Sequence, residues 1–148
     1  MNTHHDIPNP EDISIEDRED AMSGYLMMFA SIGAGIPLPV INLIAGIIYF
    51  YISRNKSPFV RFHATQAVLS QLPTSLLNAG LIFWLIRIFF FDYELNDYFK
   101  IYAVIVGFLN ISYFGFSIWA AVQARKGRMY YFLFIGKFSL GYAFKNRG

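Results

Sequence analysis

Three long stretches of this chain carry no formal charge, and they constrain its fold more than any other feature. They are residues 21–53, 62–86 and 101–124. A helix needs roughly 20 apolar residues to cross the ~30 Å hydrocarbon core of a bilayer, so the last two stretches suit one span each. Only 15% of the chain is charged, against roughly 25% in soluble domains. These features predict an all-α integral membrane protein.

The first uncharged stretch, 21–53, is too long for one straight span. As a single helix it would measure about 50 Å at 1.5 Å per residue. Pro37 and Pro39 lie inside it, and proline removes a backbone donor and clashes with the preceding turn. We therefore expect two helices, about 15–35 and 40–53, that form a Pro-broken helical hairpin. The alternative is one bent span.

The rest of the chain is assigned from its charge and its aromatic content. Residues 1–14 form an acidic flexible tail, and residues 15–128 form a helical membrane domain whose two full spans cover about 58–91 and 98–126. Residues 129–148 are basic and aromatic but too interrupted for an easy span. They are expected at the membrane interface, with rings at headgroup level and cations facing anionic lipid. The predicted fold is a small bundle of about four helices with an interfacial aromatic C-terminal segment.

Lysine and arginine near the span ends predict the orientation. They cluster in residues 54–61 and 125–147, whereas the loop at 92–100 contains three carboxylates. The two basic regions should therefore be cytoplasmic and the acidic loop outside. The N-terminus is cytoplasmic if the first stretch is a hairpin and outside if it is one bent span. We expect a multi-pass protein of the bacterial inner membrane, with its C-terminus cytoplasmic and, on the hairpin reading, its N-terminus cytoplasmic too.

Polar side chains collect on one half of the span that begins near Pro58, and a smaller polar cluster lies on the next span. An unpaired polar group is costly in lipid, so these faces should point to protein or water. Two uses remain open: hydrogen bonds that hold the helices together, or a path for a solute. The residues of this polar helix face are Ser70, Thr74 and Asn78, then Asn110 and Ser117 on the next span.

The sequence contains no recognisable catalytic or metal-binding arrangement. It has no cysteine, the uncharged stretches contain no carboxylate, and neither a nucleophile elbow nor a phosphate-binding loop is present. We expect no enzyme activity, no cofactor and no metal ion. Nucleic acid is not an expected partner, because the basic clusters flank the spans and already have a topological explanation. The expected partners are the lipid bilayer and either another protein or a second copy of the chain.

Residues 42–67 form a distinctive stretch that resembles a known family signature. The resemblance is to the Tic-like import-component family of small bacterial membrane proteins, which has a distant similarity to the twenty-kilodalton channel subunit of the chloroplast inner-envelope translocon. It covers about 22–138 and implies four spans with both termini on one side. The chain departs from the family pattern at Gly46 and at Phe132-Leu133. The matching motif residues are Asn42, Ser57, Pro58, Phe59, Val60, His63, Gln66 and Ala67.

This resemblance implies a non-enzymatic scaffold or accessory subunit linked to protein or solute translocation. The alternative is a small transporter or channel subunit that uses the polar face of helix 58–91 after oligomerisation. The motif itself has a physical interpretation. Ser57 and Pro58 suit a helix start, Phe59 and Arg61 would lie at the membrane interface, and His63 opens the polar face.

Overall fold

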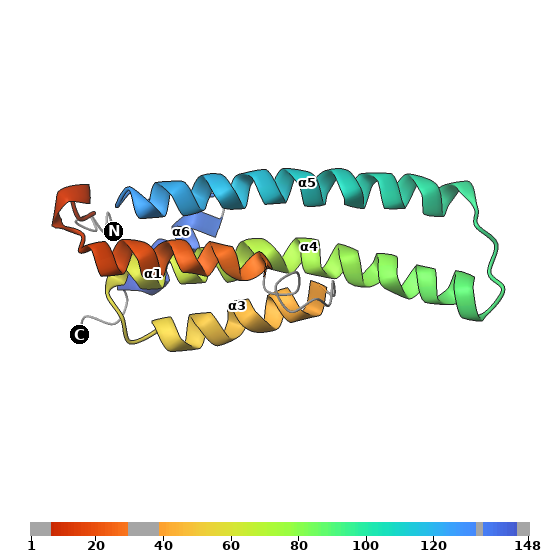
Figure 1. Cartoon of the computed structure of the whole chain (residues 1–148), viewed down its shortest axis with the longest axis horizontal. Helices are drawn as coiled ribbons and strands as arrows, with labels where there is room; N and C mark the ends of the chain where they lie inside the picture. The colour runs from red at the N-terminus through yellow and green to blue at the C-terminus, as the bar shows by residue number, and fades with distance from the viewer. Residues whose placement is uncertain (1–6, 30–38, 133–134, 145–148) are drawn as a thin grey trace.

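The computed structural model describes residues 7–29, 39–132 and 135–144. Within these ranges the chain forms five α-helices and two short 3-10 helices and contains no strand, so the all-α prediction is confirmed. The predicted proline break at Pro37 lies outside the described residues. The elements are η1 (Pro10–Asp12), α1 (Ile15–Leu26), η2 (Met27–Phe29), α3 (Pro39–Ser53), α4 (Pro58–Phe90), α5 (Asp97–Arg125) and α6 (Ile135–Phe144), as Figure 1 shows.

Local sequence signals set the starts of three helices. The hydroxyl oxygens of Ser14 and Ser57 accept hydrogen bonds from the third residue of α1 and of α4, and Pro58 occupies the first position of α4. Asn96 caps α5 in the same way, through a bond of 2.9 Å from the Phe99 amide. Such caps satisfy backbone donors that have no partner inside the helix.

Helix α5 ends in a Schellman motif. The Gly127 amide donates to the Ala124 carbonyl over 2.9 Å, and the Arg128 amide donates to the Gln123 carbonyl over 3.0 Å. Gly127 has a φ of +73°, a conformation that only glycine adopts without steric cost. A side chain there would also meet Pro10, because its Cβ would lie 2.9 Å from the Pro10 carbonyl oxygen. Gly127 therefore turns the chain back toward the bundle and lets η1 pack on the end of α5.

Helices α4 and α5 form a long antiparallel hairpin, and α1, α3 and α6 pack beside only one half of it (Figure 1). Every residue of 59–67 in α4 is buried, which requires neighbours all round the helix. Beyond Gln71, no residue of α4 is buried. We call α1, α3 and α6, with residues 58–71 and 114–125, the packed half, and residues 72–113 the thin half.

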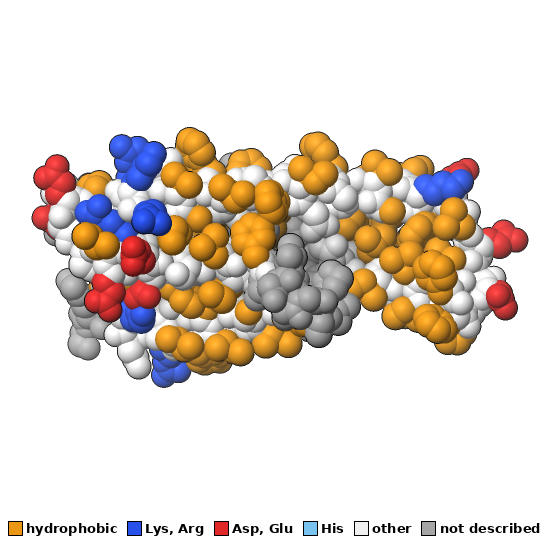
Figure 2. All heavy atoms as spheres, viewed as in Figure 1, with side chains coloured by type: hydrophobic (Ala, Val, Ile, Leu, Met, Phe, Trp, Pro, Cys, Tyr) orange, Lys and Arg blue, Asp and Glu red, His pale blue; other side chains and the backbone are white. Residues whose placement is uncertain are grey.

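The apolar surface makes the two helices of the hairpin candidate membrane spans. Helices α4 and α5 are long and apolar enough to cross a bilayer, and the most apolar 18-residue windows are 0% and 11% buried within the protein. The core helix of a soluble domain would hide such a window, so these exposed windows suit lipid. In the face shown in Figure 2, hydrophobic side chains extend along the molecule and charged side chains gather at its two ends. A membrane protein is thus the fold class that the structure supports.

Three helices differ from their predicted extents or positions. Of the helix predicted over 15–35, Ile15–Leu26 is α-helical and Met27–Phe29 forms the 3-10 helix η2, while residues 30–35 lie outside the described residues. Helix α3 begins at Pro39, and proline suits the first turn of a helix. The aromatic tail contains α6, which packs along α4 with its small residues inward: Gly136, Ser139 and Ala143.

Candidate functional site

A buried polar cluster lies in the centre of the packed half, where α1, α4 and the segment after α5 meet. The Tyr25 hydroxyl of α1 lies 2.9 Å from Nδ1 of His63. Nε2 of Gln66 donates to the Tyr25 oxygen over 2.8 Å and to the Tyr130 carbonyl over 2.7 Å. The amide of Phe132 donates to Oε1 of Gln66 over 3.2 Å. Five residues from three separate segments therefore form one hydrogen-bonded unit.

The tautomer of His63 determines the direction of its hydrogen bond to Tyr25. The Tyr25 oxygen accepts from Gln66 and its own proton can still be donated, so a neutral imidazole protonated on Nε2 would accept that proton at Nδ1. Nε2 has no hydrogen bond of ordinary geometry among the described residues.

Aromatic rings enclose this cluster. The His63 ring lies edge-on to Phe59, Phe62 and Tyr25, with centroid distances of 4.6, 4.9 and 5.7 Å. His63 and Gln66 are both 0% exposed. A polar group buried this deeply is stabilised only when it is bonded, and the cluster supplies those bonds. The cluster therefore holds the segment after α5 against α4 and α1.

The other motif residues serve the same packed half. Ser57 and Pro58 begin α4, and Asn42 lies half-buried in α3. Phe59 and Arg61, which were predicted to meet lipid at the membrane interface, are surrounded by protein instead. Phe59 is 1% exposed and Arg61 is 9% exposed, because α6 covers this side of α4. The Arg61 guanidinium donates to the carbonyl of Ala143 near the end of α6, where the negative end of the helix dipole favours a cation.

The polar face of α4 continues toward α5 in the thin half as a seam of interhelical hydrogen bonds. Asn78 and Asn110 form a reciprocal amide pair, with N–O distances of 2.8 and 3.0 Å. The hydroxyls of Ser70 and Tyr113 lie 3.4 Å apart, and the Tyr102 hydroxyl donates to a carbonyl of α4 over 2.8 Å. These contacts hold two membrane helices together.

Two residues of the predicted polar face take no part in this seam. Thr74 donates to the Gln71 carbonyl of its own helix over 2.9 Å. Ser117 is 1% exposed, and its hydroxyl has no hydrogen bond of ordinary geometry among the described residues. On the opposite side of α4, Leu72 and Leu76 are 43% and 76% exposed, which suits contact with lipid.

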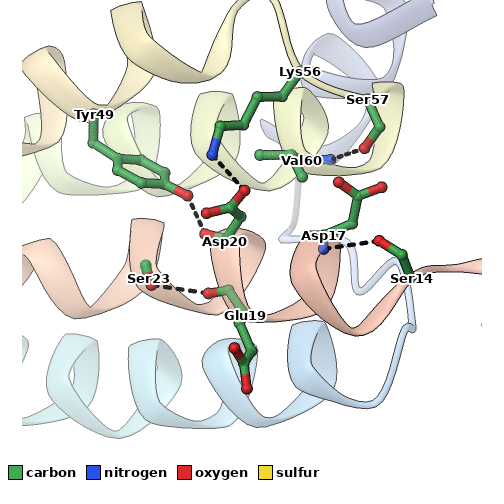
Figure 3. A network of polar contacts seen from close by, with 9 residues as sticks. All are labelled: Ser14, Asp17, Glu19, Asp20, Ser23, Tyr49, Lys56, Ser57 and Val60. Atoms are coloured by element: carbon green, nitrogen blue, oxygen red, sulfur yellow. Dashed lines mark hydrogen bonds and ion pairs between the residues drawn. The ribbon is translucent and has the colours of Figure 1, made fainter.

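Charged and phenolic groups tie α1 to α3 and to the loop before α4. Figure 3 shows the Asp20 carboxylate beside the Lys56 ammonium, with which it forms an ion pair, and the Tyr49 hydroxyl donating to the Asp20 carbonyl. Asp20 and Lys56 are both partly exposed, so the ion pair adds at most about 1 kcal/mol. These contacts orient α1 along α3 at the basic end of the bundle.

The opposite end of the hairpin is acidic and exposed. Asp97 pairs with Lys100 over 2.8 Å, and the Arg87 guanidinium lies 4.3 Å from the centre of the Tyr93 ring. Asp92 and Glu94 are exposed in the loop between α4 and α5. Among the described residues, no group of three histidine or acidic side chains is placed to hold a metal ion.

Sequence reasoning missed Tyr25, Tyr130 and Tyr49, although each makes a hydrogen bond that joins separate elements. Tyr25 and Tyr130 lie 38 and 64 residues from their partners in α4. No local pattern marks such a partner. The only signal in the sequence was indirect, because a histidine and a glutamine one turn apart in an uncharged helix require buried partners.

Comparisons with known proteins correct the predicted family and role. No curated protein and no solved structure matches the chain. The predicted membership of the Tic-like import-component family is wrong, and so is the role in translocation that it implied. Nothing supports the alternative of a small transporter or channel subunit. The structure shows why the motif misled: its residues cap and pack α4, which specifies a bundle and not an activity. Since the family model that matches covers residues 18–139, the chain belongs to the magnetosome magnetite crystal formation protein family.

Proposed function

We propose that the chain is a non-catalytic membrane component of the apparatus that forms magnetite crystals in the magnetosome. The family match carries this proposal, because it extends from α1 into α6 and so includes nearly the whole described bundle. The exposed apolar windows of α4 and α5 support a place in the membrane. The polar cluster supports a role without catalysis, since its side chains are used to bond one another.

The basic, packed end lies on the cytoplasmic side in this proposal. Helices α1 and α3 run in opposite directions, and η1 and the last turn of α6 lie at the same end of the molecule in Figure 1. That arrangement favours the hairpin over one bent span for the first uncharged stretch. The basic residues at this end favour the cytoplasm. The loop between α4 and α5 then faces the compartment in which the crystal forms.

A complementation experiment tests the role in crystal formation. Deleting the coding sequence from its magnetite-forming host should change the size or number of the crystals seen by electron microscopy. Re-expression of the chain should restore them, and so should a Gln71→Leu variant, which changes a residue outside the polar cluster. Unchanged crystals in a deletion strain shown to lack the protein would overturn the proposal.

Thiol labelling of isolated magnetosomes tests the orientation, because the native chain has no cysteine. Lys126 and Glu94 are exposed at opposite ends of the hairpin. A membrane-impermeant reagent should label Lys126→Cys at once and Glu94→Cys only after the membrane is permeabilised. The reverse pattern would show that the packed end faces the crystal.

A further inference from the structure

The protein is wide in one half of the bilayer and narrow in the other. Five helices make up the packed half. Among the described residues the thin half consists of α4 and α5, beside which the start of α3 reaches Ala79 and residues 130–132 reach Leu77. Apart from the charged first half of α1 and Lys137 of α6, the outside of the packed half also has exposed apolar side chains. On α3, for example, Ile48 and Ile52 are 54% and 61% exposed, and on α5 Phe116 and Trp119 are 55% and 53% exposed. The packed half therefore lies in the bilayer and is not a soluble domain attached to it.

The boundary between the halves coincides with the middle of the membrane. Arg61 and Arg87 bracket the uncharged part of α4, and the rise between them is about 39 Å at 1.5 Å per residue. That distance is close to the roughly 40–45 Å thickness of a bilayer with its headgroups. The midpoint of this rise falls at Thr74, and the last buried residue of α4 is Gln71.

Helix α5 gives the same result independently. Lys100 and Arg125 bracket its uncharged part, and their midpoint falls between residues 112 and 113. Most of the buried positions of α5, which packs against α1, lie on the far side of that point. They are Ser117, Ala120, Ala121, Gln123 and Ala124, whereas Phe99 and Val106 are the buried positions of α5 in the thin half. The burial of both spans is thus concentrated in the same half of the bilayer.

The taper that results is large on the scale of a membrane protein. A helix about 10 Å across occupies about 80 Å², so five helices occupy about 400 Å² and two about 160 Å². The corresponding effective radii are about 11 and 7 Å, a difference of about 4 Å over the ~15 Å that separates the centres of the two leaflets. A flat bilayer cannot match both radii, whereas a bilayer that is convex on the wide side can.

We propose that this chain is a wedge that prefers and stabilises bilayers whose leaflet around the packed half is convex. The inference rests on the orientation proposed above, which places the packed half in the cytoplasmic leaflet. A vesicle inside a cell has that leaflet on its outer, convex side. The partner of this surface is therefore the curved bilayer itself, and the chain would concentrate where a magnetosome membrane is most curved.

Membrane tubes drawn from giant vesicles test the proposal with the full chain. Single Lys126→Cys and Glu94→Cys variants change exposed residues at opposite ends, and circular dichroism checks that both remain helical. A membrane-impermeant thiol dye added outside marks only the molecules whose substituted end faces outward. The outer leaflet of the tube is convex. Molecules labelled through Lys126→Cys should be enriched severalfold in the tube over the parent vesicle, and those labelled through Glu94→Cys should be depleted.

Equal distribution of the two populations, or the reverse order, would overturn the wedge. Each labelled population is the matched control for the other, because both have the same helices and differ only in orientation. The assay contains no iron, no mineral and no other protein. If the tube assay fails and complementation succeeds, the wedge is rejected and the role in crystal formation remains. If the tube assay succeeds and complementation fails, the role in crystal formation is rejected and the wedge remains.

Discussion

Replacing Gln66 with leucine should detach the segment after α5 from the bundle. Leucine fills a similar volume but cannot bond, so the Tyr130 carbonyl and the Phe132 amide lose their partner, while Tyr25 keeps His63. An unsatisfied buried backbone group costs about 1–3 kcal/mol. Two such groups give about 2–6 kcal/mol. Because both bonds are only partly buried, we expect a loss of about 2–3 kcal/mol in the free energy of unfolding.

The same substitution at Gln71 is the matched control. Gln71 lies on the same helix and is 5% exposed, and its side chain forms no hydrogen bond within the described ranges. Its replacement by leucine should change the free energy of unfolding by less than about 1 kcal/mol. Unfolding can be measured in mixed micelles by titration with a denaturing detergent, using the fluorescence of Trp84 and Trp119.

A local measurement separates detachment of the tail from general destabilisation. Ser139 is 0% exposed on the inner side of α6, so a Ser139→Cys thiol should react slowly in the parent chain. It should react much faster beside Gln66→Leu and remain slow beside Gln71→Leu. Equal unfolding free energies for the two leucine variants, with the thiol protected in both, would refute the assignment of Gln66 as the clamp.

Two further substitutions test the turn after α5 and the seam between the spans. Gly127→Ala should lower the free energy of unfolding by at least about 1–2 kcal/mol, because its φ is +73° and the new Cβ would meet the Pro10 carbonyl. Gly115→Ala, where nothing lies within 4 Å, should be neutral or stabilising by up to about 1 kcal/mol in the same assay. A double-mutant cycle of Asn78→Leu and Asn110→Leu should give a coupling energy of about 0.6 kcal/mol and at most about 1.7 kcal/mol, the average and the maximum for hydrogen bonds between membrane helices; no coupling would show that the amide pair is not a contact in the membrane.

Features that depend on local sequence could be predicted from the chain alone. Uncharged length identified α4 and α5 as candidate spans, and Ser57 with Pro58 identified the start of α4, because a cap is satisfied within one turn of the helix. The side of α4 that contains Ser70 and Asn78 follows from helical periodicity. These signals operate over a few residues or repeat along one helix, so no knowledge of the tertiary fold is needed to use them.

Features that depend on distant segments could not be predicted. Phe59 and Arg61 follow a charged loop, and an isolated helix in lipid would place them at the interface. They are buried because α6 returns across α4, and Arg61 meets the Ala143 carbonyl 82 residues away. Tyr25 likewise has no local feature that distinguishes it from other tyrosines. The packing of the tail therefore had to come from the structure.

The motif residues of α4 lie near its start because the protein narrows from five helices to two near the middle of the membrane. The distinctive stretch ends at Ala67, inside the packed half, where helices on every side of α4 restrict each position in size and polarity. Past Gln71 no residue of α4 is buried, so most of its surface need only be apolar. A family signature should therefore gather in the packed half even if the function depends on the whole molecule. This explains why the motif predicted a helical bundle correctly and the role of the protein wrongly. The motif residues determine how five helices pack in one leaflet, whereas the proposed wedge shape depends on the depth at which that packing ends.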